Sequence, residues 1–348
     1  MKDYKKHLIS EEETIKEVLL KLGSLEDENI LFVVNHNNQL VGSLTDGDVR
    51  RGLIKGFTTS SKISNIIHRD PKFINIDNYS VDEIIFLRSN NFKVIPVVNG
   101  DNVVVDIINF QLQKSYLPVD AVIMAGGLGT RLRPLTSNLP KPLLQVGDKE
   151  IISYNFDRLS EYGILNQKIT VNYLGGLIKD YCSNYNKNIN FEIIEETEFM
   201  GTVGSLSLIE TFKNDTVLLM NSDLLTNIDY EDFYISFIEN DADIMVASIP
   251  YQMNLPYAIF ELEGKKVLSF KEKPSYTYYA NAGIYLIKKE VIEKIPKESF
   301  FNATDLMQLV INSTETELKH YPIRGYWLDI GKHEDYEKAQ HDIKHIKF

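Results

Sequence analysis

AVIMAGGLGTRLRPLTSNLPKPLL, which spans residues 121–144, is the stretch around which the chain is organised. It opens with an apolar run, residues 121–125, that predicts a buried strand. The loop after it contains three glycines, Gly126, Gly127 and Gly129. Three basic residues follow, Arg131, Arg133 and Lys141. Glycine backbone lets a ligand approach its N–H groups closely, and guanidinium and ammonium donors beside such a cradle are suited to a triphosphate.

This loop differs from two common phosphate-binding loops. No Gly-Lys-Ser/Thr closes it, as a P-loop requires, and Leu132 stands where a dinucleotide fingerprint has its third glycine. The alternative is that these residues form only a strand followed by a tight loop, with no role in binding a ligand. The whole string, Gly-Gly-x-Gly-Thr-Arg-Leu, then Pro-Leu-Thr and Pro-Lys-Pro, resembles the signature of the sugar-1-phosphate nucleotidyltransferases.

Composition limits the classes of function. The chain has 348 residues, enough for two or three domains of roughly 150 residues. Its 43% hydrophobic content supports a sizeable core, and its net charge of −12 argues against nucleic acid as a partner. Cys182 is the single cysteine, so no intrachain disulfide forms. With no signal peptide and no run long enough to span a membrane, we expect a cytoplasmic protein that does not associate with membranes.

The part before the glycine loop contains an imperfect repeat of helix, strand, strand and helix. In the first copy Ser10 and Glu13 predict a capping box, and a short helix is expected from Gly47 to Lys55. In the second copy Ser80 and Glu83 predict a helix start, and Asn99-Gly100 predicts a hairpin. This order resembles a pair of CBS motifs, a Bateman module.

A nucleotide site in that module is one of two open alternatives. Gly42-Ser-Leu-Thr45-Asp-Gly-Asp48 is similar to the ribose-binding segment of CBS motifs, so the resemblance implies a site for an adenine or other nucleotide. The second copy departs from this pattern, with Asp106 to Asn109 at the matching place. Thr45 and Asp48 are equally suited to capping a helix, and we favour this role and expect the module to assemble a homodimer or homotetramer.

The part after Asp120 alternates strands and helices, as in a doubly wound sheet. We therefore predict an α/β protein with a CBS-pair (Bateman) α+β domain, residues 1–116, before a Rossmann-like nucleotidyltransferase domain, residues 117–348. A continuously apolar strand, residues 216–220, delivers Asp223 to the carboxyl edge of the sheet, where ligands bind. Ser222 replaces the glycine that usually precedes this aspartate.

Further motifs continue the resemblance to the end of the chain. The segment 195–206 resembles the part of the family that lies beside base and sugar, and we expect it to open a helix. Glu272-Lys273-Pro274 and the strand Asn281-Ala-Gly283-Ile-Tyr match motifs that meet the sugar phosphate and the sugar. Trp327-Leu-Asp329-Ile-Gly331 matches the motif that carries the second metal ligand, and an amphipathic helix from Lys332 to Ile346 is expected to close the chain. Tyr257-Ala258 replaces the usual Tyr-Gly, which leaves the sugar undefined.

The resemblance implies a reaction in which a sugar 1-phosphate attacks the α-phosphorus of a nucleoside triphosphate and pyrophosphate leaves. It implies Mg²⁺ held by Asp223 and Asp329, with charge neutralisation supplying most of the catalysis. The implied catalytic residues are Arg131, Lys141, Asp223, Lys273 and Asp329. The implied nucleotide site is Ala125, Gly126, Gly127, Gly129, Thr130, Arg131, Lys141, Glu196, Gly201 and Thr202. The implied sugar-phosphate site is Glu272, Lys273, Asn281 and Gly283.

Glu196 is the residue that bears on the choice of base. It lies where the family contacts the base edge, and a carboxylate only accepts hydrogen bonds. Guanine presents two adjacent donors and uracil or thymine only one, so GTP is the expected donor, with UTP and dTTP left open. The domain order resembles the glucosamine-1-phosphate guanylyltransferases of legionaminic acid biosynthesis. Mannose or heptose 1-phosphate remain alternatives, and so does a non-catalytic, nucleotide-sensing regulatory protein.

Overall fold

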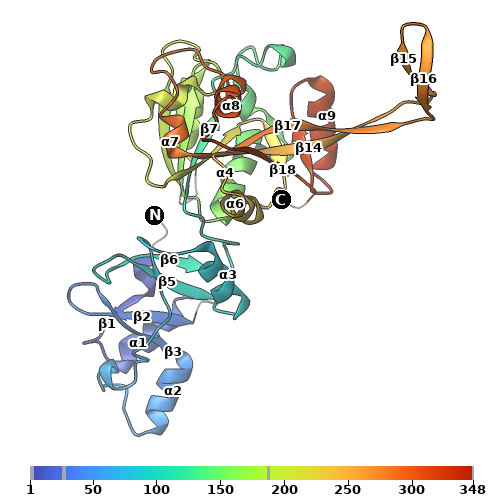
Figure 1. The fold of residues 1–348 in the computed structure, drawn as a ribbon. Coiled ribbons are helices and arrows are strands. Elements are labelled where there is room, and N and C mark those ends of the chain that lie inside the picture. Colours follow the sequence, from blue (N-terminus) through green and yellow to red (C-terminus); the bar gives the residue numbers. More distant parts are fainter. Residues whose placement is uncertain (1–3, 26–28, 186–188, 347–348) are drawn as a thin grey trace. The chain divides into compact units, whose positions relative to one another are not determined.

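The computed structural model describes residues 4–25, 29–185 and 189–346 (Figure 1). The chain divides into two compact units. The first contains residues 1–117 together with the short segment 160–163, and the second contains residues 118–159 and 164–348. Each unit is described by itself below.

The first unit contains two similar halves. The first half consists of the elements β1 (Leu8–Ser10), α1 (Ile15–Gly23), β2 (Ile30–Val34), β3 (Leu40–Thr45) and α2 (Asp46–Ile54), after a 3-10 turn, Tyr4–His7. The second half consists of a 3-10 turn, Ile63–Asn65, and the elements β4 (Ile74–Asn75), α3 (Val81–Ser89), β5 (Val94–Val98) and β6 (Val104–Asn109). Both three-stranded sheets combine one parallel and one antiparallel pair, β1-β2-β3 and β4-β5-β6. The predicted order of helix, strand, strand and helix is present in the first half, whereas in the second half α3, β5 and β6 are followed by no helix in the described residues before β7.

The helix caps of this unit correct one prediction. Helix α1 does not start from Ser10, because Ser10 ends β1, where it pairs with Val34. Its N-cap is Thr14, and a capping box joins Thr14 to Glu17, one helical turn after the predicted pair. The predicted cap of α3 is confirmed, since Ser80 Oγ accepts a hydrogen bond from the backbone N–H of Glu83.

The second unit is built on a seven-stranded sheet in the order β11-β10-β7-β12-β17-β14-β18. Its strands are β7 (Val119–Met124), β10 (Asn166–Val171), β11 (Asn190–Glu195), β12 (Thr216–Asn221), β14 (Ile244–Asn254), β17 (Ser275–Lys288) and β18 (Leu318–Pro322). The four strands β11, β10, β7 and β12 are parallel, whereas β17 is antiparallel to both of its neighbours. The two inner strands β7 and β12 are buried at every position but the last, as expected for parallel strands that are covered on both faces. The predicted α/β fold with a Rossmann-like parallel core is confirmed.

In the described part of this unit the helices are α4 (Ile151–Glu161), α5 (Gly175–Ser183), α6 (Tyr230–Glu239), α7 (Lys289–Ile292), α8 (Ala303–Ile311) and α9 (His333–Asp342). The short elements are β8 (Gln145–Val146), β9 (Lys149–Glu150), β13 (Leu224–Thr226), β15 (Ile259–Glu263), β16 (Lys266–Lys271) and β19 (Trp327–Asp329), with 3-10 turns at Thr130–Leu132, Lys141–Leu143 and Gly204–Leu208. A large core cluster on the sheet includes the buried side chains of Val122, Leu219 and Tyr285, with Leu306 from α8.

Two predicted helices of this unit differ from the structure. The segment from Gly204 forms only a 3-10 turn, Gly204–Leu208, and not the predicted helix, and the N–H groups of Val203 and Gly204 donate to the carbonyl of Phe301. Helix α9 starts at His333 and ends at Asp342, earlier than the predicted Ile346. None of the helices in the described ranges combines the length and apolar character that a membrane crossing requires.

Candidate active site

A cavity of about 450 Å³ opens at the carboxyl ends of β7, β10 and β12 in the second unit. This edge of a parallel sheet is where ligands of α/β proteins bind. All ten residues that the sequence assigned to the nucleotide line it: Ala125, Gly126, Gly127, Gly129, Thr130, Arg131, Lys141, Glu196, Gly201 and Thr202. Asp223 lines the same cavity.

The glycine loop is held in a conformation that requires glycine. Gly129 has φ of +60°, and an added Cβ there would lie 3.2 Å from Cβ of Lys141. Thr136 fixes the loop by donating its hydroxyl to the Gly129 carbonyl at 2.8 Å. Within the part of the chain that the structure describes, the backbone N–H groups of Gly126 and Gly127 donate no hydrogen bond. Free N–H groups in such a loop are suited to phosphate oxygens.

Glu196 lies just after β11 and beside the glycine loop. Its side chain is buried, and Oε2 accepts a hydrogen bond from the backbone N–H of Met200 at 3.3 Å. Oε1 faces Gly126, where an added Cβ would lie 3.0 Å away. Burial raises the pKa of Glu196, and hydrogen bonds from Met200 and Ser205 oppose that shift. The cavity therefore contains a hydrogen-bond acceptor next to the glycine loop.

The loop that contains Gly201 and Thr202 packs against a segment distant in sequence, at Phe301 and Ala303. Gly201 has φ of +79°, and an added Cβ would lie 2.7 Å from the carbonyl oxygen of Phe301. The Thr202 hydroxyl accepts a hydrogen bond from the N–H of Ala303 at 2.7 Å, at the start of α8. The close approach and the bond fix this wall of the cavity.

Two aspartates from separate motifs meet beside the cavity. Asp223 follows β12, and the next residue, Leu224, pairs with Asp329 in the antiparallel β13–β19 ribbon. The ammonium group of Lys141 forms an ion pair with Asp223 and lies 3.7 Å from Oδ1 of Asp329. A lysine and two carboxylates from three separate stretches thus form one charged cluster.

The charges of this cluster fit a divalent cation. Oδ1 of Asp223 and Oδ1 of Asp329 are buried and have no hydrogen-bond partner. Burial, and then the Asp223 carboxylate, raise the pKa of Asp329, while Lys141 and Arg131 oppose the shift. The described residues contain no group of three metal-ligating side chains, so an ion here would take its other ligands from substrate. Mg²⁺ is the ion that commonly combines one or two carboxylates with substrate phosphates.

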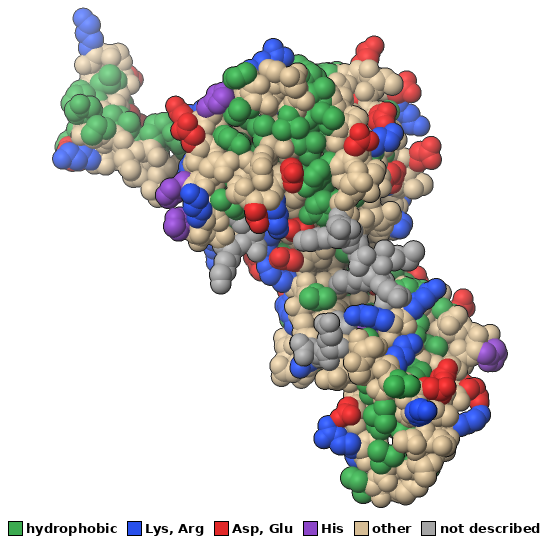
Figure 2. Space-filling view, turned by 180° about the vertical axis from the view of Figure 1, so that it is seen from behind, with side chains coloured by type: hydrophobic (Ala, Val, Ile, Leu, Met, Phe, Trp, Pro, Cys, Tyr) green, Lys and Arg blue, Asp and Glu red, His purple; other side chains and the backbone are tan. Residues whose placement is uncertain are grey.

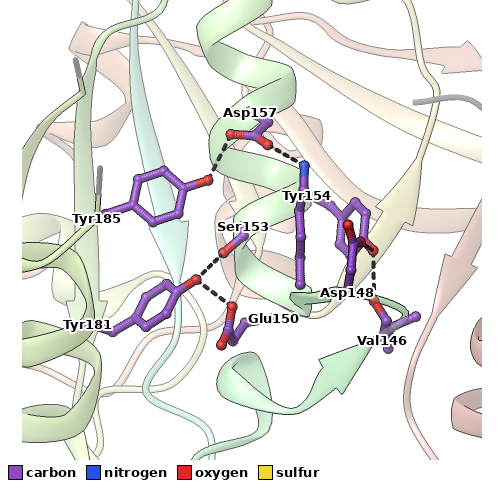
Figure 3. Close-up of polar contacts among 9 residues, drawn as sticks. Val146, Asp148, Glu150, Ser153, Tyr154, Asp157, Tyr181 and Tyr185 are labelled. Carbon is purple, nitrogen blue, oxygen red and sulfur yellow. Dashed lines mark hydrogen bonds and ion pairs between the residues drawn. The ribbon is translucent and has the colours of Figure 1, made fainter. Parts of the chain in front are cut away.

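Helix α4 supports this edge of the sheet through a polar network (Figure 3). Tyr154 donates to the carbonyl of Val146, at 2.7 Å, and so fixes the chain shortly after Lys141. Two tyrosines bind side chains on or just before α4. Tyr181, on α5, contacts Ser153 and Glu150. Tyr185, which follows α5, donates to Asp157. Asn155 donates to the carbonyl of Ser222 at 3.3 Å, which positions the turn before Asp223.

The four residues predicted for the sugar phosphate do not line this cavity. Glu272 and Lys273 lie on an extended part of the molecule, between β16 and β17. Asn281 lines a separate cavity of about 520 Å³, and its amide donates to the Tyr285 hydroxyl at 2.9 Å. Gly283 lies in a bulged stretch with φ of +72° and backs onto Asn221, where an added Cβ would be 2.5 Å from Nδ2.

Sequence reasoning missed Asn172 and assigned no role to Asn221. Both amides line the cavity at the ends of β10 and β12. Asn172 also donates to the carbonyl of Glu196 at 3.1 Å and so joins two adjacent strand ends. The rule that ligands meet the carboxyl ends of parallel strands would have identified them, since each stands at the end of a strand of the parallel core.

In the first unit, Thr45 and Asp48 form the capping box of α2. The Thr45 hydroxyl and backbone N–H both contact Oδ2 of Asp48, at 2.6 and 2.9 Å, and Arg51 binds Oδ1. The Thr45 hydroxyl, the Arg51 guanidinium and the Thr45 N–H lower the pKa of Asp48 against the opposing effect of burial. The polar groups of this segment are therefore engaged with one another.

The fold agrees with the comparison to known families. Residues 120–346 match the nucleotidyl transferase family, and residues 5–55 match the CBS domain. The first match covers more than half of the chain, so the chain belongs to the nucleotidyl transferase family. The predicted combination of a nucleotidyltransferase with a CBS domain is confirmed.

Among characterised relatives, a probable mannose-1-phosphate guanylyltransferase from Oryza sativa subsp. japonica is 30% identical over 227 residues. The match covers 62% of each chain, so this chain spans less than two thirds of that relative's length. A D-glycero-alpha-D-manno-heptose 1-phosphate guanylyltransferase from Aneurinibacillus thermoaerophilus is 29% identical over 233 residues, 65% of this chain and 99% of the relative.

Solved structures of related proteins also match this chain. HddC from Yersinia pseudotuberculosis, 26% identical, covers 65% of this chain and 99% of its own with a TM-score of 0.51. A second structure of HddC, in complex with GMP-PN, matches with a TM-score of 0.50. A putative glucose-1-phosphate thymidylyltransferase from Bacillus anthracis, 23% identical with a TM-score of 0.53, shares the fold.

Proposed function

We propose that this protein is a sugar-1-phosphate guanylyltransferase, which converts GTP and a sugar 1-phosphate into a GDP-sugar and pyrophosphate. The observation that carries the proposal is the cavity itself. It is lined by the glycine loop, by Arg131 and Lys141, and by the buried acceptor Glu196. Guanine presents two adjacent donors to such an acceptor. The guanylyltransferase relatives and the GMP-PN complex of HddC support this choice of nucleotide.

In this proposal each residue has a role set by its charge. Gly126, Gly127 and Arg131 bind the phosphates that leave as pyrophosphate. Lys141 neutralises charge near the α-phosphate, which an oxygen of the sugar phosphate attacks. The attacking phosphate is ionised at neutral pH, so the reaction needs no general base. Asp223 and Asp329 would hold Mg²⁺, which would neutralise phosphate charge when bound.

The sugar and the assembly are further parts of the proposal. Glucosamine 1-phosphate, as in legionaminic acid biosynthesis, is our first choice because of the domain order, and mannose or heptose 1-phosphate are the alternatives that the relatives favour. We propose that residues 1–116 assemble a homodimer or homotetramer and that residues 117–348 form the catalytic domain. An adenine or other nucleotide is the candidate ligand of the first domain, near Thr45. The proposed location is the cytoplasm, where nucleoside triphosphates are abundant.

A substrate panel tests the proposal. The full-length protein is incubated with Mg²⁺ and each pairing of GTP, ATP, UTP or dTTP with glucosamine, mannose, glucose or heptose 1-phosphate, and pyrophosphate release is followed. Release that is fastest with GTP supports the proposal. Release that is fastest with UTP or dTTP would reassign the base, and no release with any pairing would favour a non-catalytic role.

A further inference from the structure

Phe199 is an exposed aromatic residue in the wall of the candidate active site. Of the described residues that line the cavity, it is the only aromatic one. Large apolar side chains are also exposed elsewhere on the second unit, for example on the arm, residues 249–280, that projects from the sheet (Figure 2). Phe199, which is 56% exposed, differs from those on the arm because it lines the cavity. Its ring is therefore available to contact a ligand there.

A hydrogen bond holds Phe199 close to Glu196. The backbone N–H of Met200, the residue after Phe199, donates to Oε2 of Glu196 at 3.3 Å. The peptide group that follows Phe199 therefore lies against the Glu196 carboxylate. One wall of the cavity thus combines a buried hydrogen-bond acceptor with an exposed aromatic side chain.

The loop that carries Phe199 is fixed by the segment before α8. The N–H of Phe301 donates to the carbonyl of Met200 at 2.9 Å. Next to this bond the ring of Phe300 lies beside that of Phe199, with 5.9 Å between the ring centroids and 59° between the planes. Phe300 itself does not line the cavity. Because aromatic pairs attract each other, Phe300 positions the ring of Phe199 before a ligand binds.

An acceptor and a ring are suited to two different sides of a nucleobase. The edge of guanine carries hydrogen-bond donors, which a carboxylate accepts. Its faces are flat π surfaces, and stacking on an aromatic side chain is tolerant of base identity because every base has such a face. The neighbours of Glu196 in the cavity, Gly126 and Asn172, offer no aromatic surface. Phe199 is thus the residue beside Glu196 that can cover the face of a base.

We propose that Phe199 stacks on the base of the bound nucleotide, whose edge donates to Glu196. This inference rests on the proposed function, because it takes the ligand of the cavity to be a nucleoside triphosphate. The ring of Phe199 contributes affinity for any base, whereas Glu196 discriminates among bases. Phe300 supports the ring from outside the cavity.

Binding of two ligands separates the base from the phosphates. Phe199→Ala should weaken binding of GTP about tenfold, the scale of losing one base–aromatic stack, whereas binding of tripolyphosphate, which has no base, should not change. Phe199→Trp keeps an aromatic face and should bind GTP as tightly as the wild type. Phe260→Ala, at a 58% exposed position of the arm outside the cavity, is the matched control and should not alter GTP binding. Unchanged GTP affinity in Phe199→Ala, or an equal loss for both ligands, would overturn the proposal.

A fluorescence measurement tests the contact directly. In Phe199→Trp the new indole should lie against the base, so GTP should quench its emission and tripolyphosphate should not. The wild type, whose single tryptophan is Trp327, gives the background signal. Saturation with GTP that leaves the emission of the new tryptophan unchanged would show that the base does not stack there.

Turnover separates this contact from the proposed function. If Phe199→Ala loses GTP affinity but the wild type releases no pyrophosphate with any sugar 1-phosphate, the proposed function alone is wrong. If the wild type turns over and Phe199→Ala raises only the KM for the sugar 1-phosphate, Phe199 contacts the sugar and the stacking alone is wrong. A wild type that binds no nucleotide would overturn both.

Discussion

The ammonium group of Lys141 lies 3.7 Å from Oδ1 of Asp329, in a cluster that also contains the ion pair between Lys141 and Asp223. Lys141 is one-tenth exposed, and one oxygen of each aspartate is buried without a hydrogen-bond partner. This lysine is thus the main counter-charge for two carboxylates, with Arg131 acting on Asp329 from further away. A divalent cation would compensate the same charges.

The first prediction follows from this double role. Lys141→Met should destabilise the metal-free protein by about 3 kcal/mol, because breaking a buried ion pair leaves uncompensated charge. Mg²⁺ should then raise the melting temperature of the variant more than that of the wild type, because binding to the folded state stabilises it. Calorimetry with chelator and with Mg²⁺ measures both effects. An equal effect of Mg²⁺ on the two proteins would mean that no ion binds beside Lys141.

The second prediction concerns the metal ligands. Asp223→Asn and Asp329→Asn should each lower turnover by roughly three orders of magnitude, the scale of losing a preorganised electrostatic group. Both variants should fold, and both should lose the Mg²⁺ binding heat seen by titration calorimetry. Asp241→Asn is the control, since its side chain is 92% exposed and lies away from the cavity. Near-native turnover of either variant in Mg²⁺ would remove it from the metal site.

The third prediction concerns the glycine loop. Arg131→Ala should weaken binding of the triphosphate by about 1.5–3 kcal/mol, the contribution of a hydrogen bond to a charged group. Arg133→Ala is the matched control, because Arg133 is exposed two residues later and does not line the cavity. Titration of GTP into both variants gives the two affinities. If Arg133→Ala lost as much as Arg131→Ala, a general loss of positive charge would explain both.

The fourth prediction concerns the base. Glu196→Gln keeps one acceptor but adds an amide donor that would face the donors of guanine, so kcat/KM for GTP should fall by more than that for UTP. Steady-state rates with both nucleotides measure the ratio. Equal losses with the two nucleotides would show that Glu196 only supports the fold, through its hydrogen bond from Met200.

The fifth prediction uses the same variant to measure a pH effect. Burial raises the pKa of Glu196, so the folded protein holds that proton more tightly than the unfolded chain does. Below the ordinary value of 4.5 both states are protonated, and wild type and Glu196→Gln should melt alike. As the pH rises through the raised pKa, the wild type should lose stability relative to the variant. Melting curves from acid to neutral pH test this, with the exposed Glu198→Gln as control, and a difference that does not change with pH would contradict it.

The sequence by itself determined the parts of this protein that depend on neighbouring residues. The apolar run before Gly126 and the cap at Ser80 depend on residues within one strand or one helical turn, and local patterns also indicated the order of helices and strands in the internal repeat. The motif string was long enough to indicate the family, which the family match confirmed. The predicted cap at Ser10 was wrong, because Ser10 pairs with Val34 in the β1–β2 ladder and α1 starts after Thr14.

The tertiary structure decided what depends on strands that are distant in sequence. The β13–β19 register places Asp329 beside Asp223, and strand order places the amide of Asn172 next to Glu196. It also placed Lys273 on an exposed arm, away from the cavity to which its motif had assigned it. Local residue patterns determine one helical turn or one strand. Which of these side chains lie close together depends instead on pairing between strands distant in sequence, and on the direction in which β14 and β17 leave the sheet.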